Sequence, residues 1–203
     1  MSTQRKPIDR FHSIIPAGGI GSRLWPLSRA SAPKFLHDLT GSGQTLLQDT
    51  WERLSPLSGQ ERIMVVTGKA HSGAVKEQVE DLDLANLVLE LSPKDSTAAI
   101  SLAAAILAKR EPDVIIGSFA ADHVIVEADV FHATVREAIE VAATGKIVVI
   151  GIAPTEPSVA FGYIKAGSKL EVADAPSARA VEKFVEKPSM ATARKYVESG
   201  KYL

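Results

Sequence analysis

The chain has 203 residues, with 23 lysines and arginines against 24 aspartates and glutamates, a formal net charge of -1 and a hydrophobic share of 45%. These figures fit one soluble globular domain, or one domain and part of another, and they exclude a disordered chain. The charge balance argues against a general nucleic-acid binder, and the absence of cysteine excludes disulfides, thiolate metal sites and cysteine nucleophiles.

The apolar runs of the sequence are too short to cross a membrane. The longest runs, 98–108 and 114–126, stay below the roughly 18–20 residues of a spanning helix, and polar residues interrupt the second run. The N-terminus begins with basic residues, but only a very short apolar stretch precedes Pro16, which is too little for the core of a signal peptide. We therefore predict a cytoplasmic protein that binds neither a membrane nor nucleic acid.

Short apolar runs alternate with helical stretches along the first three quarters of the chain. Strands are predicted at 11–15, 63–67, 87–91, 114–119 and 146–152, and helices at 45–54, 71–82, 97–109 and 128–143. Such an alternation predicts an α/β fold that is Rossmann-like, with a mostly parallel central sheet and helices on both faces. The helix at 97–109 is apolar on nearly all sides, so we expect it to be buried.

The pattern changes after residue 152. Strands at 161–165 and 180–185 have no helix between them, and a helix at 190–199 ends at Gly200. We predict one domain over 1–203. The chain stops on two apolar residues just after this helix, so we expect an N-terminal fragment of a longer protein, with the domain incomplete at its C-terminus.

A glycine-rich loop, residues 17–23, directly follows the first strand. Glycines permit positive φ and let backbone N–H groups approach an anion. In an open α/β sheet, ligands lie beyond the carboxyl ends of the strands. The loop is therefore predicted to bind phosphate, and the alternative is a tight turn between two elements.

Two better-known phosphate motifs do not fit this loop. The dinucleotide fingerprint G-x-G-x-x-G/A matches at Gly19 and Gly21, but Leu24 occupies its third position. Asp38 lies near the expected acidic position, yet two prolines interrupt the helix that should follow. A P-loop needs Gly-Lys-Ser/Thr, which the sequence lacks.

Two cations lie close to the loop in the sequence. A fixed cation such as Arg23 or Lys34 beside a phosphate cradle would neutralise charge on a phosphoryl group. The alternative is that these side chains, like Arg29, are solvated surface charges.

The segment 18–35, GGIGSRLWPLSRASAPKF, resembles the signature of nucleotidyltransferases that join a nucleoside triphosphate to a sugar 1-phosphate. Its Leu-Trp-Pro-Leu-Ser-Arg stretch points to the mannose-1-phosphate guanylyltransferase branch. Four further segments are similar to those of this branch, in the same order: 94–100, 121–123, 161–164 and 185–188. The resemblance runs from Ile14 to Leu203.

Some positions depart from the pattern of that family. Lys34 runs directly into Phe35 where a glutamine is common, and Ala120 replaces a proline. Asp95 and Ser96 replace asparagine and threonine. The resemblance also implies a sugar-binding segment and a second metal-binding carboxylate beyond Leu203.

The resemblance implies that an oxygen of mannose 1-phosphate attacks the α-phosphorus of GTP, giving GDP-mannose and pyrophosphate. Catalysis then depends on holding two anions in line and neutralising them. Arg23 would hold the leaving β- and γ-phosphates, and Lys34 would contact the α-phosphate. The implied nucleotide-binding residues are Ala17, Gly18, Gly19, Gly21, Ser22 and Ser96.

Asp122 follows the strand at 114–119, near the carboxyl end of the sheet. A carboxylate there suits Mg²⁺, which prefers oxygen ligands and takes one or two from protein. The alternative is that Asp122 caps a turn or helix. We interpret His123 as structural, and the acidic run 80–83 as a solvated face rather than a metal cluster.

Three residues in the last quarter are implied to bind the sugar phosphate. Lys187 would bind its phosphate, Glu186 a sugar hydroxyl, and Gly162 would permit close approach of the sugar. The alternatives are a solvated Glu–Lys pair and a β-bulge glycine. For Ser96, we favour a helix N-cap over a nucleotide contact.

Two other functions stay open at this point. One is a sugar-1-phosphate nucleotidyltransferase for a different base or sugar, and the other is a catalytically silent nucleotide-binding paralogue. Because the implied second carboxylate is absent, we expect the isolated chain to bind nucleotide better than it turns over. The sequence leaves the oligomeric state open, a homo-oligomer included.

Overall fold

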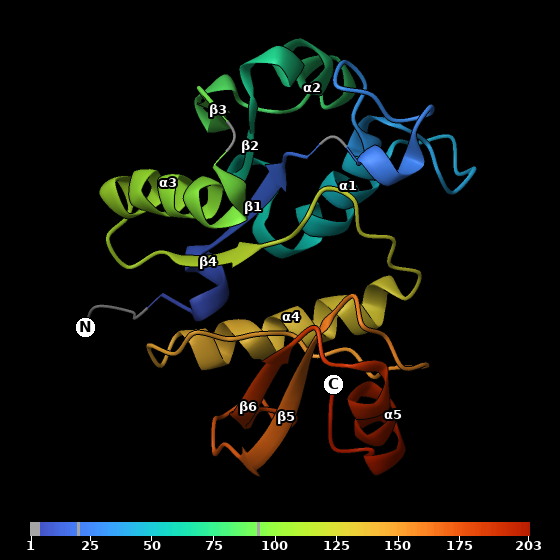
Figure 1. Cartoon of the computed structure of the whole chain (residues 1–203). Helices are drawn as coiled ribbons and strands as arrows, with labels where there is room; N and C mark the ends of the chain where they lie inside the picture. The colour runs from blue at the N-terminus through green and yellow to red at the C-terminus, as the bar shows by residue number, and fades with distance from the viewer. Residues whose placement is uncertain (1–4, 20, 93) are drawn as a thin grey trace. The chain divides into compact units, whose positions relative to one another are not determined.

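The computed structural model describes residues 5–19, 21–92 and 94–203, so the first four residues and Ile20 of the glycine loop lie outside the described residues. The chain divides into two compact units, Met1–His132 and Ala133–Leu203, which are described separately below (Figure 1). The prediction of one domain over 1–203 stays a prediction.

The described strands are β1 (Phe11–Ala17), β2 (Ile63–Gly68), β3 (Leu87–Glu90), β4 (Ile115–Ser118), β5 (Gly162–Lys169) and β6 (Arg179–Glu186). The described α-helices are α1 (Leu46–Ser58), α2 (Ser72–Gln78), α3 (Asp95–Arg110), α4 (Ala128–Ala142) and α5 (Met190–Ser199). Short 3-10 helices are Pro7–Arg10, Ser22–Leu24, Lys34–Leu36, Gln60–Arg62, Lys69–His71 and Leu84–Asn86.

In the first unit, β1 to β4 form a parallel sheet among the described residues, in the order β3-β2-β1-β4 (Figure 1). β1 lies in the middle, with Ile14 beside Met64 of β2 and Phe11 beside Ile115 of β4. Its residues are nearly all buried, as expected for a strand that is covered on both faces. The predicted α/β fold with a parallel sheet is confirmed.

Helices cover both faces of this sheet. Successive side chains of a strand point to opposite faces. The hydroxyl of Ser13 lies 3.0 Å from that of Ser58 at the end of α1, whereas Ile14 packs with Ala103 and Leu107 of α3. α1 and α3 therefore lie on opposite faces of β1, as predicted.

Three helices differ from their predictions. α1 ends at Ser58, four residues later than expected. α2 ends at Gln78, four residues earlier than expected. α3 buries one face through Ala99, Ala103 and Leu107, whereas Leu102 is 42% exposed. The expected burial on nearly all sides is wrong. Apolar residues also occur on protein surfaces, so an alanine-rich helix can be apolar all round and still expose one face to solvent.

The second unit contains an antiparallel pair, β5 and β6, and the helix α5. Both strands and the helix were predicted, and Gly200 ends α5 in the left-handed conformation, as expected. Tyr163 of β5 is buried and its ring contacts Tyr196 of α5 at a centroid distance of 5.5 Å. Leu203 exchanges two backbone hydrogen bonds with Ile164, of 2.8 and 2.9 Å.

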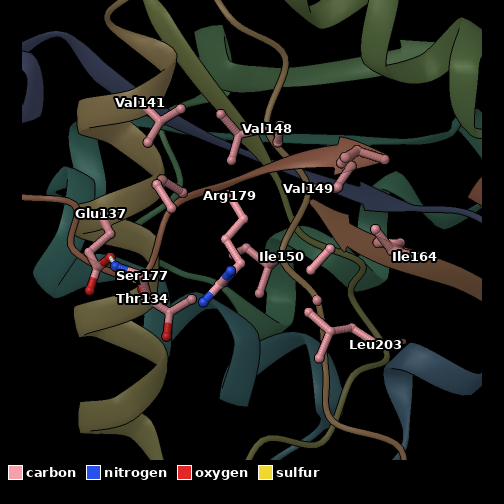
Figure 2. A pocket seen from close by; sticks show the side chains of 16 residues that line it. Thr134, Glu137, Val141, Val148, Val149, Ile150, Ile164, Ser177, Arg179 and Leu203 are labelled. Carbon is pink, nitrogen blue, oxygen red and sulfur yellow. Dashed lines mark hydrogen bonds between the residues drawn. The ribbon is translucent and has the colours of Figure 1, made fainter. Parts of the chain in front are cut away.

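The predicted strand at 146–152 is wrong. In the described structure these residues form no backbone ladder, which a strand requires. Instead, Val148, Val149 and Ile150 line a pocket of about 310 Å³ within the second unit, which Figure 2 shows from close by. The apolar run therefore contributes to the wall of a pocket in the second unit.

None of the helices in the described part of the chain has the length and apolar character that a membrane crossing requires. The cytoplasmic location stays a prediction.

Candidate functional site

The candidate site lies in the first unit, at the carboxyl ends of β1 and β4. The hydroxyl of Thr67 donates to the carbonyl of Ala17 over 2.8 Å and holds the end of β1. Beyond β4, the N–H of Phe119 donates to Ile14 and that of Ala121 donates to Pro16. The chain therefore continues beside β1 after β4 has ended, and this brings the next residues to the glycine-rich loop.

The glycine-rich loop uses the conformational freedom of two glycines. Gly19 and Gly21 have φ of 86° and 69°. A side chain on Gly21 would also collide, because its Cβ would lie 2.7 Å from Cβ of Lys34. Gly21 is therefore required both for its backbone conformation and for the close approach of Lys34. Positive φ was predicted for this loop and is confirmed at these two residues.

The stretch between Gly21 and Lys34 folds back on itself. The hydroxyl of Ser28 donates to the carbonyl of Gly21. Arg29 and Ala32 exchange backbone hydrogen bonds of 2.9 and 3.0 Å, which close a turn. Pro33 then precedes the 3-10 helix that Lys34 begins. This path explains why residues far apart in the sequence meet at the loop.

Lys34 and Asp122 form an ion pair at the site. The Nζ atom of Lys34 lies 3.2 Å from Oδ2 of Asp122 and 3.4 Å from its backbone oxygen. The two side chains are 32% and 43% exposed, so solvent and ligands reach both. Both residues lie beside the glycine-rich loop in the structure, and their roles stay predictions.

The ion pair faces a pocket of about 90 Å³. Its walls are Pro16, Gly18, Gly19, Gly21, Lys34, Phe35, Ala121 and Asp122. Pockets for whole organic ligands usually measure about 300–1,000 Å³, so this one suits a group of the size of a phosphate. The pocket combines a cation, a carboxylate and glycine backbone, which together suit a phosphate that arrives with a metal ion.

Four residues that were predicted to bind the nucleotide or its phosphates are absent from the wall of this pocket: Ala17, Ser22, Arg23 and Ser96. Ser22 and Arg23 belong to the short helix after Gly21 and are exposed. Ser96 is already inside α3, which begins at Asp95 and has Lys94 as its N-cap. The preferred interpretation of Ser96 as the N-cap is therefore wrong, because the helix begins two residues earlier than that role requires.

Gly162, Glu186 and Lys187 lie together in the second unit. Gly162 pairs in register with Glu186, and a Cβ on it would lie 2.8 Å from Oε2 of that carboxylate. The register shifts of this strand pair begin only at Lys165, so the alternative of a β-bulge at Gly162 is wrong. Lys187 and Glu186 form an ion pair of 3.5 Å, with side chains 65% and 59% exposed.

The described residues contain no cluster of three or more histidine or acidic side chains that would cage a metal ion. A single carboxylate, Asp122, faces the phosphate-sized pocket. Mg²⁺ commonly takes one or two carboxylates and completes its shell with substrate phosphates and water. The donor set therefore fits a magnesium ion that binds together with a phosphate.

The acidic run 80–83 lies away from this pocket wall. Asp81 and Asp83 are exposed, as predicted for a solvated acidic run.

Five residues of the site were not predicted to belong to it: Pro16, Ser28, Phe35, Thr67 and Ala121. Ser28 and Thr67 hold backbone carbonyls of the loop and of β1, and Phe35 lines the pocket. The sequence could have indicated Phe35, because a large apolar residue next to Lys34 is expected to be buried close to it. The sequence gives no indication of the roles of Ser28 and Thr67, because their hydroxyls bind backbone carbonyls at other positions in the chain.

A family model described as "Nucleotidyl transferase" matches residues 12–203 of this chain. A mannose-1-phosphate guanylyltransferase of Escherichia coli (strain K12) is 40% identical over 198 residues, which cover 95% of this chain and 41% of the relative. The xanthan biosynthesis protein XanB of Xanthomonas campestris pv. campestris is also 40% identical, and 39% of its length is covered. The chain thus spans about two fifths of the length of these relatives.

Solved structures resemble the fold. A protein of Thermus thermophilus, titled mannose-1-phosphate geranyltransferase, matches with a TM-score of 0.84 and 31% identity, over 95% of this chain and 54% of that one. A protein of Helicobacter pylori, titled mannose-6-phosphate isomerase, matches with a TM-score of 0.74 at 21% identity, over 95% of this chain and 66% of that one. At that identity the second likeness concerns the fold alone.

Proposed function

The chain belongs to the nucleotidyl transferase family, and from this membership we propose that it transfers the guanylyl group of GTP to mannose 1-phosphate. The products are GDP-mannose and pyrophosphate. The observation that carries the proposal is the Lys34–Asp122 pair, which faces a phosphate-sized pocket beside the glycine-rich loop. The choice of base and sugar is supported by relatives of about 40% identity that are named mannose-1-phosphate guanylyltransferase.

The reaction joins two anions, so charge is the main obstacle. A phosphate oxygen of the sugar forms a bond to the α-phosphorus while the bond from that phosphorus to the bridging oxygen breaks, and pyrophosphate leaves with the electron pair. Lys34 contributes an ammonium group at the pocket, and the glycines let backbone N–H groups approach the phosphates. Both contributions stabilise negative charge that grows on the leaving group.

Asp122 would hold a magnesium ion together with the nucleotide phosphates, and the ion would neutralise phosphate charge there. Arg23 is exposed on the short helix that follows Gly21, where its long side chain is free to contact the leaving β- and γ-phosphates. Ala17, at the end of β1, and Ser22 belong to the glycine-rich loop and are proposed to contact the nucleotide. Ser96, in the first turn of α3, is proposed to contact the nucleotide.

The sugar 1-phosphate is proposed to bind at the start of β5 and the end of β6. Lys187 provides a cation for its phosphate, and Glu186 provides an acceptor for a sugar hydroxyl. Both side chains are more than half exposed, and Gly162 adds no side chain that would cover them. A site that hydrogen-bonds a hydroxyl discriminates strongly against sugars that lack it.

The proposal is tested by incubating the chain with Mg²⁺ and each pairing of GTP, UTP or dTTP with mannose 1-phosphate or glucose 1-phosphate. Nucleotide sugar and pyrophosphate are quantified, and the binding of each nucleotide is measured in parallel. Fastest formation of GDP-mannose supports the proposal. Faster product formation from another pairing indicates a different base or sugar. Nucleotide binding without product fits both a silent paralogue and the expectation that this chain binds nucleotide better than it turns over. A chain that binds none of the nucleotides contradicts the proposal.

A further inference from the structure

Ser28 is buried in the stretch that joins the glycine-rich loop to Lys34. Its exposed fraction is 1%, and its hydroxyl donates to the carbonyl oxygen of Gly21. The same oxygen accepts the N–H of Leu24 over 2.9 Å. A carbonyl oxygen has two lone pairs, so both are used here. The orientation of the peptide group after Gly21 is therefore fixed from two directions.

The fixed turn at Gly21 is in contact with Lys34. A Cβ on Gly21 would lie 2.7 Å from Cβ of Lys34 and 3.5 Å from the hydroxyl oxygen of Ser28. A rotation of the Gly21 backbone would therefore change the contact between Gly21 and Lys34. Lys34 in turn reaches Asp122 at 3.2 Å across the pocket. One chain of contacts thus runs from the Ser28 hydroxyl to the two charged groups.

We propose that Ser28 is a positioning residue, whose buried hydroxyl holds the turn at Gly21 so that Lys34 stands at the phosphate pocket before any ligand binds. The nucleotide as ligand of this pocket rests on the proposed function. The effect of Ser28 on the turn does not rest on it. Pre-organisation of this kind strengthens binding, because the ligand does not have to order the loop.

The test uses three variants of the full chain. Ser28→Ala removes the hydroxyl, and Ser28→Thr keeps it. Ser13→Ala is the matched control, because Ser13 is also fully buried in the first unit but its hydroxyl contacts Ser58 of α1. The loss of one buried hydrogen bond from each alanine variant makes their losses of global stability comparable.

The first readout is amide hydrogen exchange at Leu24, whose N–H donates to the Gly21 carbonyl. We expect exchange at Leu24 to be about three- to tenfold faster in Ser28→Ala and unchanged in Ser28→Thr and Ser13→Ala. The second readout is calorimetric titration of inorganic tripolyphosphate and of GTP, both with Mg²⁺. Both dissociation constants should rise by the same factor in Ser28→Ala, and Ser28→Thr should restore them.

The outcomes separate the two proposals. Equal effects of Ser28→Ala and Ser13→Ala on exchange at Leu24 would overturn the role of Ser28. Unchanged affinities in Ser28→Ala would also overturn it, where the wild-type chain binds the ligands. If the wild-type chain binds neither ligand while the exchange result holds, the proposed function fails and the role of Ser28 in fixing the turn stands.

Discussion

The Nζ atom of Lys34 lies 3.2 Å from Oδ2 of Asp122, although 88 positions separate the two residues in the sequence. The loop after β1 supplies the cation, and the segment after β4 supplies the carboxylate. Because both side chains are partly exposed, the ion pair is weak and each charged group can exchange its partner for a ligand. A phosphate that attracts Lys34 would release Asp122, and a metal ion that attracts Asp122 would release Lys34.

This exchange predicts opposite effects of Lys34→Met on two ligands. Free Mg²⁺ should bind the variant up to about fivefold more tightly, because a partly exposed ion pair of up to about 1 kcal/mol no longer competes for Asp122. The complex of Mg²⁺ with GTP should bind the variant more weakly, because the phosphates lose a cation. Calorimetric titrations measure both affinities, with Lys76→Met on α2 as the control. A parallel loss of both affinities would contradict the exchange.

Gly21→Ala should destabilise the chain and disturb the pocket. An alanine at φ of 69° costs about 1–2 kcal/mol, and its Cβ would also press on Lys34 at 2.7 Å. Gly73→Ala in α2 is the control, because a Cβ there meets no atom within 4 Å. That variant should be neutral or slightly stabilising. Urea unfolding measures both, and a Gly21→Ala variant as stable as the control variant would show that the turn is not as described.

The loop at 38–43 is stabilised by the charge of Asp38. The N–H groups of Gly43 and Gly41 donate to its carboxylate at 2.9 and 2.7 Å, and that of Thr40 at 3.0 Å. These bonds, the one from Gly43 above all, hold the pKa of Asp38 below its ordinary value of 3.8. The unfolded chain therefore binds the proton more readily, and the contribution of Asp38 to stability is lost as the pH falls below about 3.8.

Asp38→Asn isolates this contribution, because the variant cannot titrate at that position. The stability difference between the wild-type chain and the variant should stay constant from pH 7 to pH 5 and should shrink in acid. Urea unfolding at a series of pH values measures it. A difference that grows as the pH falls would have the wrong sign for a carboxylate with a lowered pKa.

The sequence was sufficient for elements whose signal is local. Residues 63–66 of β2 form a continuous apolar run because both faces of the sheet are covered. The end of α5 at Gly200 follows from the left-handed conformation that glycine favours. The strand expected at 146–152 failed because a strand also needs a partner, and no local pattern specifies one. The exposed face of α3 could not be predicted either, because it depends on which elements pack against the helix.

The candidate site shows the same division. The glycines, Lys34 and Asp122 could be found from residue types and from the resemblance to a family. The 3.2 Å contact between the two charged groups and the support from Ser28 could not, because each depends on how separate loops pack at one edge of the sheet. Hydrogen bonds from side chains to distant carbonyls leave no periodic signal in a sequence.

The central claim is that Asp122 and Lys34 form a magnesium-dependent site for a nucleoside triphosphate. It is tested most directly by calorimetric titration of GTP, UTP and dTTP, with and without Mg²⁺, into the wild-type chain and into Asp122→Asn. The wild-type chain should bind GTP most tightly and should need Mg²⁺, whereas the variant should lose the Mg²⁺ dependence and about tenfold or more in affinity, equal to about 1.4 kcal/mol or more. Equal affinity and equal Mg²⁺ dependence in the two proteins would contradict the claim.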